Sequence, residues 1–231
     1  MIRKQTLIII PAKDKSTRLP HKNILDFHGK PLIAYAIEKA LSICDVNDIC
    51  ISTESEQVTK VAMDSGAKVP FIRPKELSVD PATISDVCKH SIEHYMANGI
   101  HYENVIVLLP TSPLVTVTDI LKGYEMFQTL DGTVMSVTEF PVPPYNARCF
   151  VKQSLRLVPC FPDSPYKSTK STECPKTYHS NGAFVIFSTE KFLESGSIYG
   201  NDIYGYIMPQ EQSIDIDTKY DFEIAKHLFG L

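Results

Sequence analysis

Short apolar segments alternate with amphipathic segments along the chain. The apolar segments are continuous rather than interleaved with polar residues, and this pattern is typical of strands buried on both faces of a sheet. They cover residues 7–10, 48–52, 105–109, 133–137 and 183–187. The pattern therefore predicts a layered structure with buried central strands.

Apolar residues recur at helical spacing between these strands. In the segment 30–43, Pro31 suits the first turn of a helix, and one face is marked by Leu32, Ile33, Ala36, Ile37, Ala40 and Leu41. Residues 55–66 and 82–99 repeat the pattern, and each ends at a glycine, where a helix is expected to stop. The alternation predicts an α/β fold with right-handed crossovers and a doubly wound, mostly parallel sheet.

Residues 139–180 break this alternation. They have little helical periodicity and hold seven of the sixteen prolines, namely Pro141, Pro143, Pro144, Pro159, Pro162, Pro165 and Pro175. A long irregular segment inside a compact domain usually has a function, such as a lid or an interface. We expect one domain over residues 1–231, with a lid or interface insert at 139–180.

The composition fits a soluble globular enzyme or binding protein. The chain has 231 residues, 43% of them hydrophobic, and a net charge of −4, so no overall field attracts nucleic acid or anionic lipid. The apolar segments are shorter than the roughly 20 residues that a bilayer requires. We therefore expect a cytoplasmic protein with no nucleic-acid or membrane partner. The six scattered cysteines form no CxxC pair and are expected to be reduced thiols.

A basic loop follows the first strand, in "LIIIPAKDKSTRLPHKNI". Ligands of open α/β sheets bind at the carboxyl ends of the strands, so this loop is a candidate anion site. It lacks the glycines of a phosphate-binding loop, and side-chain cations would have to neutralise phosphates instead. Its candidate binding residues are Ala12, Lys13, Ser16, Arg18, Lys22 and Asn23. The alternative is a solvated basic loop without a ligand.

The second candidate is the acidic segment "SIDIDTKYDF", residues 213–222. In a strand, Asp215 and Asp217 would share a face and converge on one Mg²⁺, while Ile214 and Ile216 would face the core. Mg²⁺ binds one or two carboxylates together with substrate phosphates, so this pair implies a nucleotide. The alternative for Asp217 is to cap the helix that follows.

Other polar residues stand beside predicted strands. "LLPTSPL" places Thr111 and Ser112 at a strand exit between two prolines, and "YHSNGAF" places His179 and Asn181 before another strand. His90 and His94 have the i, i+4 spacing of a zinc pair, but no third ligand accompanies them, which favours a solvated helix face.

Several motifs occur in the order found in one enzyme family. The first strand, "PAKDKSTRLPHKNI", "FHGKPLIAYAI", "ISTE", "RPKELSVDPAT", "PTSPL", "SNGAF" and "DIDT" together resemble the CMP-sialic acid synthetases and their pseudaminic and legionaminic acid relatives. The resemblance runs from about residue 8 to residue 229. It implies a Rossmann-like nucleotidyltransferase fold. The implied reaction is attack of a sugar's anomeric hydroxyl on the α-phosphate of CTP, with release of pyrophosphate and a role for Mg²⁺.

The resemblance also implies roles for individual residues. Lys13, Ser16, Lys22 and Asn23 match the nucleotide-binding loop, with Lys22 neutralising phosphate, and Ala82 and Thr83 fall in the stretch that touches the cytosine nucleotide. Asp215 and Asp217 match the metal aspartates. Thr111, Ser112, His179 and Asn181 lie where the family holds the sugar. The catalytic residues expected from these matches are Lys22, Asp215 and Lys13. The insert 139–180 would form a homodimer.

The chain departs from the family pattern at several positions. Lys13 stands where arginine is usual, Thr17 and Arg18 replace a lysine and a glycine, and Leu109 and Val115 replace polar residues around "PTSPL". The sugar is therefore left open among N-acylneuraminate, pseudaminate and legionaminate. "STRLP" also resembles Kdo cytidylyltransferases, which is one alternative. A non-catalytic protein that binds nucleotide sugars is another.

Overall fold

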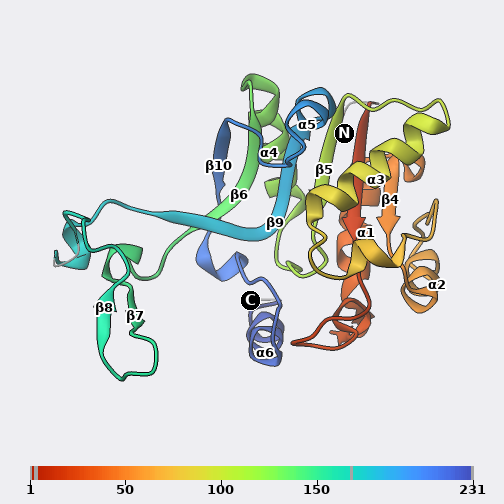
Figure 1. Ribbon diagram of the computed structural model, residues 1–231. Coiled ribbons are helices and arrows are strands. Elements are labelled where there is room, and N and C mark those ends of the chain that lie inside the picture. The colour runs from red at the N-terminus through yellow and green to blue at the C-terminus, as the bar shows by residue number, and fades with distance from the viewer. Residues whose placement is uncertain (1, 3–4, 167–168, 230–231) are drawn as a thin grey trace.

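A six-stranded sheet organises the body of the protein (Figure 1). The computed structural model describes residues 2, 5–166 and 169–229. The strand order is β10-β6-β9-β5-β1-β4. The strands of this sheet are β1 (Thr6–Pro11), β4 (Ile49–Ser52), β5 (Asn104–Leu108), β6 (Thr133–Glu139), β9 (Tyr178–Ser188) and β10 (Ile203–Ile207). All of them run parallel except β9, which confirms the predicted mostly parallel sheet.

Helices cover both faces of the sheet, as a doubly wound fold requires. They are α1 (Leu32–Ile43), α2 (Glu56–Asp64), α3 (Ile84–Ala97), α4 (Val117–Thr129), α5 (Thr189–Ser195) and α6 (Lys219–Leu228). Along β1, Ile8 and Ile10 pack with α1, α2 and α4, whereas Leu7 and Ile9 pack with α3 and α5. Both faces of β1 are therefore buried, which explains its continuous apolar sequence.

Strand β9 is longer than predicted and runs in the opposite direction to its neighbours. The apolar segment 183–187 is only its second half, and the strand pairs antiparallel with both β5 and β6. The amino-terminal half of β9 therefore lies at the carboxyl ends of the parallel strands. This direction brings Asn181 to the edge of the sheet where ligands bind.

The carboxyl edge of the sheet is closed by a third apolar cluster. Phe222 and Ala225 of α6 pack there against Phe27 of a small hairpin, which is formed by β2 (Asp26–Phe27) and β3 (Lys30–Pro31), and against Ile216. The cluster joins the last helix of the chain to the loop that follows β1. Two segments at opposite ends of the sequence thus meet at the candidate site.

Residues 140–166 and 169–177 form an arm that projects from the body (Figure 1). The arm carries a hairpin of β7 (Arg148–Phe150) and β8 (Leu157–Pro159), and its backbone continues directly into β9.

The six cysteines, some of them in the arm, are free thiols, as expected. Among the helices that the structure describes, none is both long and apolar enough to cross a bilayer.

Candidate active site

A pocket of about 290 Å³ opens at the carboxyl edge of β1 and β5. It collects residues from the first loop, from the start of α3, from the exit of β5 and from the segment before α6. Of the residues predicted from the sequence, those that line it are Lys13, Lys22, Asn23, Ala82, Thr83, Thr111, Asp215 and Asp217. The cavity at this edge of the sheet therefore carries both cations and carboxylates, where the strand exits predicted a ligand site.

The basic loop is tied to the acidic segment by ion pairs. Lys22 Nζ donates to Asp217 Oδ1 at 3.0 Å and to the carbonyl oxygen of Ile216 at 3.0 Å. The Arg18 guanidinium lies 2.6 Å from Asp217 Oδ2. The Lys22 side chain is only 12% exposed, whereas that of Arg18 is 63% exposed. Lys22 is therefore the cation held inside the pocket, whereas Arg18 pairs with Asp217 from an exposed position and does not line the pocket.

Asn23 organises the start of the loop. It is buried, and its amide Nδ2 donates to the carbonyl oxygen of Lys13 at 2.8 Å. Its Oδ1 is buried without a partner among the described residues. Since buried polar atoms are normally hydrogen-bonded, this oxygen has the capacity to accept a donor from a bound ligand.

Asp215 and Asp217 both face the pocket, but not from a strand. Residues 213–217 belong to none of the described strands, and the segment is anchored by the Ile216 N–H, which donates to the carbonyl oxygen of Thr111 at 2.8 Å. Ile216 is fully buried, as predicted. The helix-capping alternative for Asp217 is wrong because Thr218 caps α6 in a capping box with Asp221.

Asp215 carries a negative charge that its surroundings do not compensate. Burial of its carboxylate raises its pKa, although one side of the residue stays open to the pocket. The charges of Asp217 and Asp221 raise the pKa further, and a hydrogen bond from Thr111 and the charge of Lys22 act against them. A divalent cation would relieve this repulsion, and two carboxylates that line one pocket suit the oxygen preference of Mg²⁺.

A buried ion pair that the sequence did not reveal forms another wall of the pocket. Arg73 lines the pocket, and its guanidinium lies 2.8 Å from Glu54 Oε2. The other Glu54 oxygen, Oε1, accepts the Asp14 N–H at 2.9 Å, and Ser78 Oγ donates to Oε2 at 2.9 Å. Glu54 therefore joins the loop after β1 to the segment that begins at Arg73. In the sequence, the only sign of Arg73 was its place in the motif "RPKELS".

Several predicted residues support the pocket without lining it. Ser112 and Asn181 are buried, at 2% and 1% exposure, and Ser112 Oγ donates to the Asn181 carbonyl oxygen at 3.4 Å. Ala12 is buried, and its N–H donates to Ser52 O, while Ser16 N–H donates to Asp14 O within the loop. His179 packs on Phe140 at the base of the arm, with ring centroids 4.5 Å apart.

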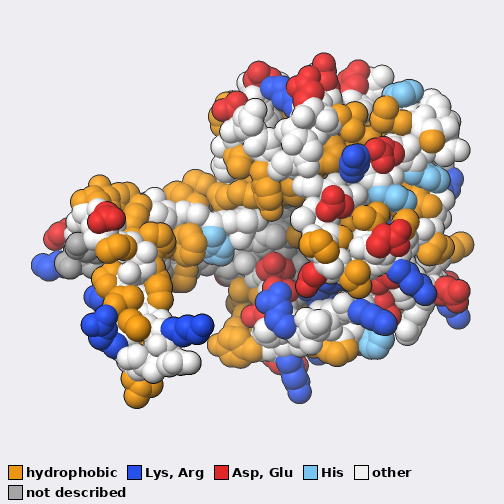
Figure 2. Space-filling model, viewed as in Figure 1, with side chains coloured by type: hydrophobic (Ala, Val, Ile, Leu, Met, Phe, Trp, Pro, Cys, Tyr) orange, Lys and Arg blue, Asp and Glu red, His pale blue; other side chains and the backbone are white. Residues whose placement is uncertain are grey.

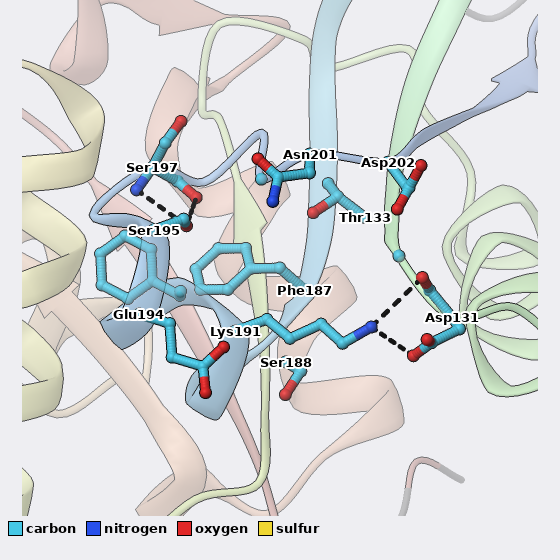
Figure 3. Close-up of a pocket in the computed structure, with 13 residues that line it drawn as sticks. Asp131, Thr133, Phe187, Ser188, Lys191, Glu194, Ser195, Ser197, Asn201 and Asp202 are labelled. Atoms are coloured by element: carbon cyan, nitrogen blue, oxygen red, sulfur yellow. Dashed lines mark hydrogen bonds and ion pairs between the residues drawn. The ribbon is translucent and has the colours of Figure 1, made fainter.

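A second cavity of about 340 Å³ lies at the opposite edge of the sheet, near the start of β6 and the end of β9 (Figure 3). Its charged lining residues are Asp131, Glu194, Asp202 and Lys191, and Lys191 is paired with Asp131. This excess of carboxylates would repel a triphosphate. The cation-lined pocket at the carboxyl edge is therefore the better nucleotide site.

Comparison with known proteins agrees with this geometry. A family model described as cytidylyltransferase matches residues 7–193. A pseudaminic acid cytidylyltransferase of Campylobacter jejuni is 37% identical over 97% of this chain and 96% of its own length. An N-acylneuraminate cytidylyltransferase of Escherichia coli is 34% identical over 97% of this chain and 52% of its own length. A CMP:2-keto-3-deoxy-manno-octonic acid synthetase solved with CTP shares the fold, with a TM-score of 0.66, 17% identity and coverage of 97% and 98% of the two chains.

Proposed function

The chain belongs to the cytidylyltransferase family, and we propose that it activates an acidic nine-carbon sugar with CTP, giving the CMP-sugar and pyrophosphate. The observation that carries the proposal is the convergence of Lys13, Lys22, Asp215 and Asp217 in one pocket at the carboxyl edge of the sheet. The cations suit the phosphates of a nucleotide, and the carboxylates suit a metal that phosphates share.

The first substrate to test is a pseudaminate. Leu109 and Val79 line the pocket beside Thr111, so part of its wall is apolar and cannot hydrogen-bond a sugar hydroxyl. The 37% identity to a pseudaminic acid cytidylyltransferase supports the same choice. N-acylneuraminate and legionaminate remain within the proposed class. The Kdo enzyme shares only the fold at 17% identity, which gives that alternative less support.

The residues of the pocket would have separate roles in the proposed reaction. Lys22 and Lys13 would neutralise the triphosphate. The anomeric hydroxyl would then lose its proton to water as its oxygen bonds to the α-phosphorus and the bond to pyrophosphate breaks. Ala82 and Thr83, at the start of α3, and Arg73 would bind the cytosine nucleotide. Thr111 would face the sugar, with Ser112 and Asn181 fixing the wall behind it. Lys22 stays ordered for this role because Asp217 and the Ile216 carbonyl hold it.

The site residues fit a bound Mg²⁺, which we propose as the cofactor. Asp215 and Asp217 would hold it together with phosphate oxygens, in keeping with the raised pKa of Asp215. When bound, the ion would stabilise charge on the phosphates and on the leaving pyrophosphate. Among the described residues, no third histidine, cysteine, aspartate or glutamate completes the cluster, so the substrate must supply the remaining ligands together with water.

We also propose that the enzyme is a cytoplasmic homodimer that forms through the arm. The arm exposes large apolar side chains over its surface (Figure 2), among them Val142, Phe150, Leu155, Leu157 and Phe161. Contiguous apolar surface of this kind usually marks an interface. Sedimentation at micromolar concentration should give the dimer mass, and a monomer alone would count against the assembly.

The test of the reaction is a substrate panel. Purified protein is mixed with CTP, Mg²⁺ and, in separate reactions, pseudaminate, legionaminate, N-acetylneuraminate or Kdo. Pyrophosphate release is measured, and the CMP-sugar is identified by its mass. We expect release with a nine-carbon acid and none without sugar. Product from Kdo alone would replace the nine-carbon class by the eight-carbon alternative.

A matched variant separates catalysis from binding. Asp215→Asn keeps the size of the side chain and should abolish release while the protein remains folded by circular dichroism. A protein that only binds nucleotide sugars would not need this carboxylate. Binding of CTP without release from any acid in the wild type would overturn the proposed reaction and support the binding-protein alternative.

A further inference from the structure

Lys39 is a half-buried lysine outside the nucleotide pocket. It lies on α1, and its Nζ donates a hydrogen bond to the carbonyl oxygen of Pro113 at 2.6 Å. Both residues line a cavity of about 500 Å³ whose remaining walls are mostly apolar, including Leu114, Val115, Leu228 and Phe229. Among the described residues, no carboxylate forms an ion pair with Lys39. Within the part of the chain that the structure describes, the Pro113 carbonyl oxygen is therefore the one hydrogen-bond partner of Lys39 Nζ.

This placement is electrostatically unfavourable for a lysine. Burial lowers the pKa of Lys39 to about 8 from its ordinary value of 10.5, although the charges of Glu38 and Asp119 act in the opposite direction. An apolar side chain of similar length would fit the same walls without this cost. Packing thus gives no reason for an ammonium group at this position. The interaction that uses this ammonium group is its hydrogen bond to the Pro113 carbonyl oxygen.

Pro113 belongs to the strand exit that shapes one wall of the nucleotide pocket. Pro110 and Thr111 line that pocket, and Ser112 N–H donates to Leu109 O at 3.2 Å. On the pocket side, the carbonyl oxygen of Thr111 is held by the Ile216 N–H. Because proline fixes its own φ, the remaining backbone freedom of Pro113 is rotation about ψ, which moves its carbonyl group. Lys39 holds that carbonyl through its hydrogen bond and lines a different cavity from the nucleotide pocket.

We propose that Lys39 is a positioning residue, which holds Thr111 and Ser112 in place for the sugar by anchoring the carbonyl oxygen of Pro113. The inference rests on the proposed function in one respect, namely that this strand exit faces the sugar. Lys39 touches no part of the nucleotide pocket itself. Substitution of Lys39 should therefore lower the affinity for the sugar and leave the affinity for CTP nearly unchanged.

The kinetic test compares Lys39→Met with Lys39→Arg. We expect Lys39→Met to raise KM for the sugar about tenfold, the value of one charge-assisted hydrogen bond, and to change KM for CTP less than about twofold. Lys39→Arg keeps a cationic donor and should recover most of the sugar affinity. Lys60→Met, which removes an exposed lysine on α2, is the matched control. Equal sugar KM values for Lys39→Met and wild type would overturn the inference.

The pH dependence of KM for the sugar distinguishes a role of the Lys39 charge from a purely structural role. The groups that face Lys39 are Glu38 on its own helix, Asp119 on α4 and Glu211 across the cavity. Lys39 is the group whose lowered pKa, about 8, falls within the pH range of the test. Wild-type KM for the sugar should rise above about pH 8, as the ammonium loses its proton. The Lys39→Arg variant should show no such rise, and a rise of equal size in both proteins would count against Lys39.

Hydrogen exchange measured without substrate tests the role of Lys39 independently of the proposed reaction. Amide hydrogen exchange of residues 111–116 should be faster in Lys39→Met than in wild type, whereas exchange in β1 should be unchanged. Absence of product in the wild type would refute the proposed reaction and leave this comparison intact. Unchanged exchange in residues 111–116 would show that Lys39 does not hold the turn.

Discussion

Gly182 lies directly against the carboxylate of Asp215. A Cβ atom at position 182 would stand 2.7 Å from Asp215 Oδ2, closer than real Cβ contacts allow. Gly182 also has φ of +68°, in the left-handed region that favours glycine. A residue of β9 thus sets the space available to a side chain of the segment before α6.

The first prediction concerns this contact. Gly182→Ala should displace the Asp215 carboxylate and lower kcat/KM about 100-fold, because a shift of about 1 Å in a reacting group has that effect. Gly196→Ala is a matched control, since Gly196 has φ of +70° but nothing within 4 Å of its would-be Cβ. Both variants should lose about 1 kcal/mol of stability through backbone strain. Equal activity losses would mean that strain, rather than the Asp215 contact, is responsible.

The second prediction separates the cations of the basic loop. Lys22→Met should lower kcat/KM about 100-fold, because a buried cation aimed at developing charge is lost. Lys15→Met, which removes an exposed lysine from the same loop, should change kcat/KM less than about twofold. Steady-state kinetics with varied CTP measures both. Similar effects in the two variants would mean that the loop acts only through its overall charge.

The third prediction concerns the buried pair of Glu54 and Arg73. Burial alone would raise the pKa of Glu54, but hydrogen bonds from Asp14 N–H and Ser78 and the charge of Arg73 hold it below its ordinary value of 4.5. This carboxylate therefore stabilises the fold at neutral pH, and the contribution is lost as the pH falls through the lowered pKa. Glu54→Gln should lower the free energy of unfolding by about 3 kcal/mol at neutral pH, because it leaves Arg73 buried and unpaired.

Denaturant unfolding over a series of pH values tests this prediction. The difference between wild type and Glu54→Gln should shrink in acid, where the wild-type carboxylate is also protonated. Glu54→Leu combined with Arg73→Met should recover part of the stability, since it leaves no buried charge. A difference that is independent of pH would contradict the assignment of the effect to the Glu54 charge.

The fourth prediction is a gain in stability with a loss of function. Lys39→Met should raise Tm at neutral pH by about 3 °C, because it removes a half-buried ammonium from mostly apolar surroundings. The pKa of Lys39 is about 8 in the folded protein, and its ordinary value is 10.5. Between these two pH values the unfolded state binds more protons than the folded state, so wild-type stability rises with pH. The Tm difference should therefore narrow at high pH. Scanning calorimetry measures it, and a lower Tm for Lys39→Met would mean that the Pro113 bond outweighs the cost of burial.

Lys22 could be predicted because it lies in the loop that follows strand β1. Asp217 lines the pocket as predicted, although the strand expected for it is absent among the described residues. Lys22 and Asp217 are 195 positions apart, yet both were found from their own local patterns, and the fold brings them to 3.0 Å. Arg73 and Glu54 were missed because a buried pair looks like ordinary surface charge in a sequence. The direction of β9 was not predictable either, since no residue pattern within a strand encodes its direction. Strand β10 was missed because its residues alternate between exposed and half-buried, without a continuous apolar run.

Strand β9 connects the arm to the active site in one stretch of backbone. Its first residues continue from the arm, its middle supplies Asn181 and Gly182, and its end lies in the core of the sheet. A subunit that binds the arm would thereby restrain the backbone behind the pocket. Assembly and sugar binding would then be thermodynamically linked, so dilution that separates subunits should weaken sugar binding, and saturating sugar should favour the assembled form by the same factor.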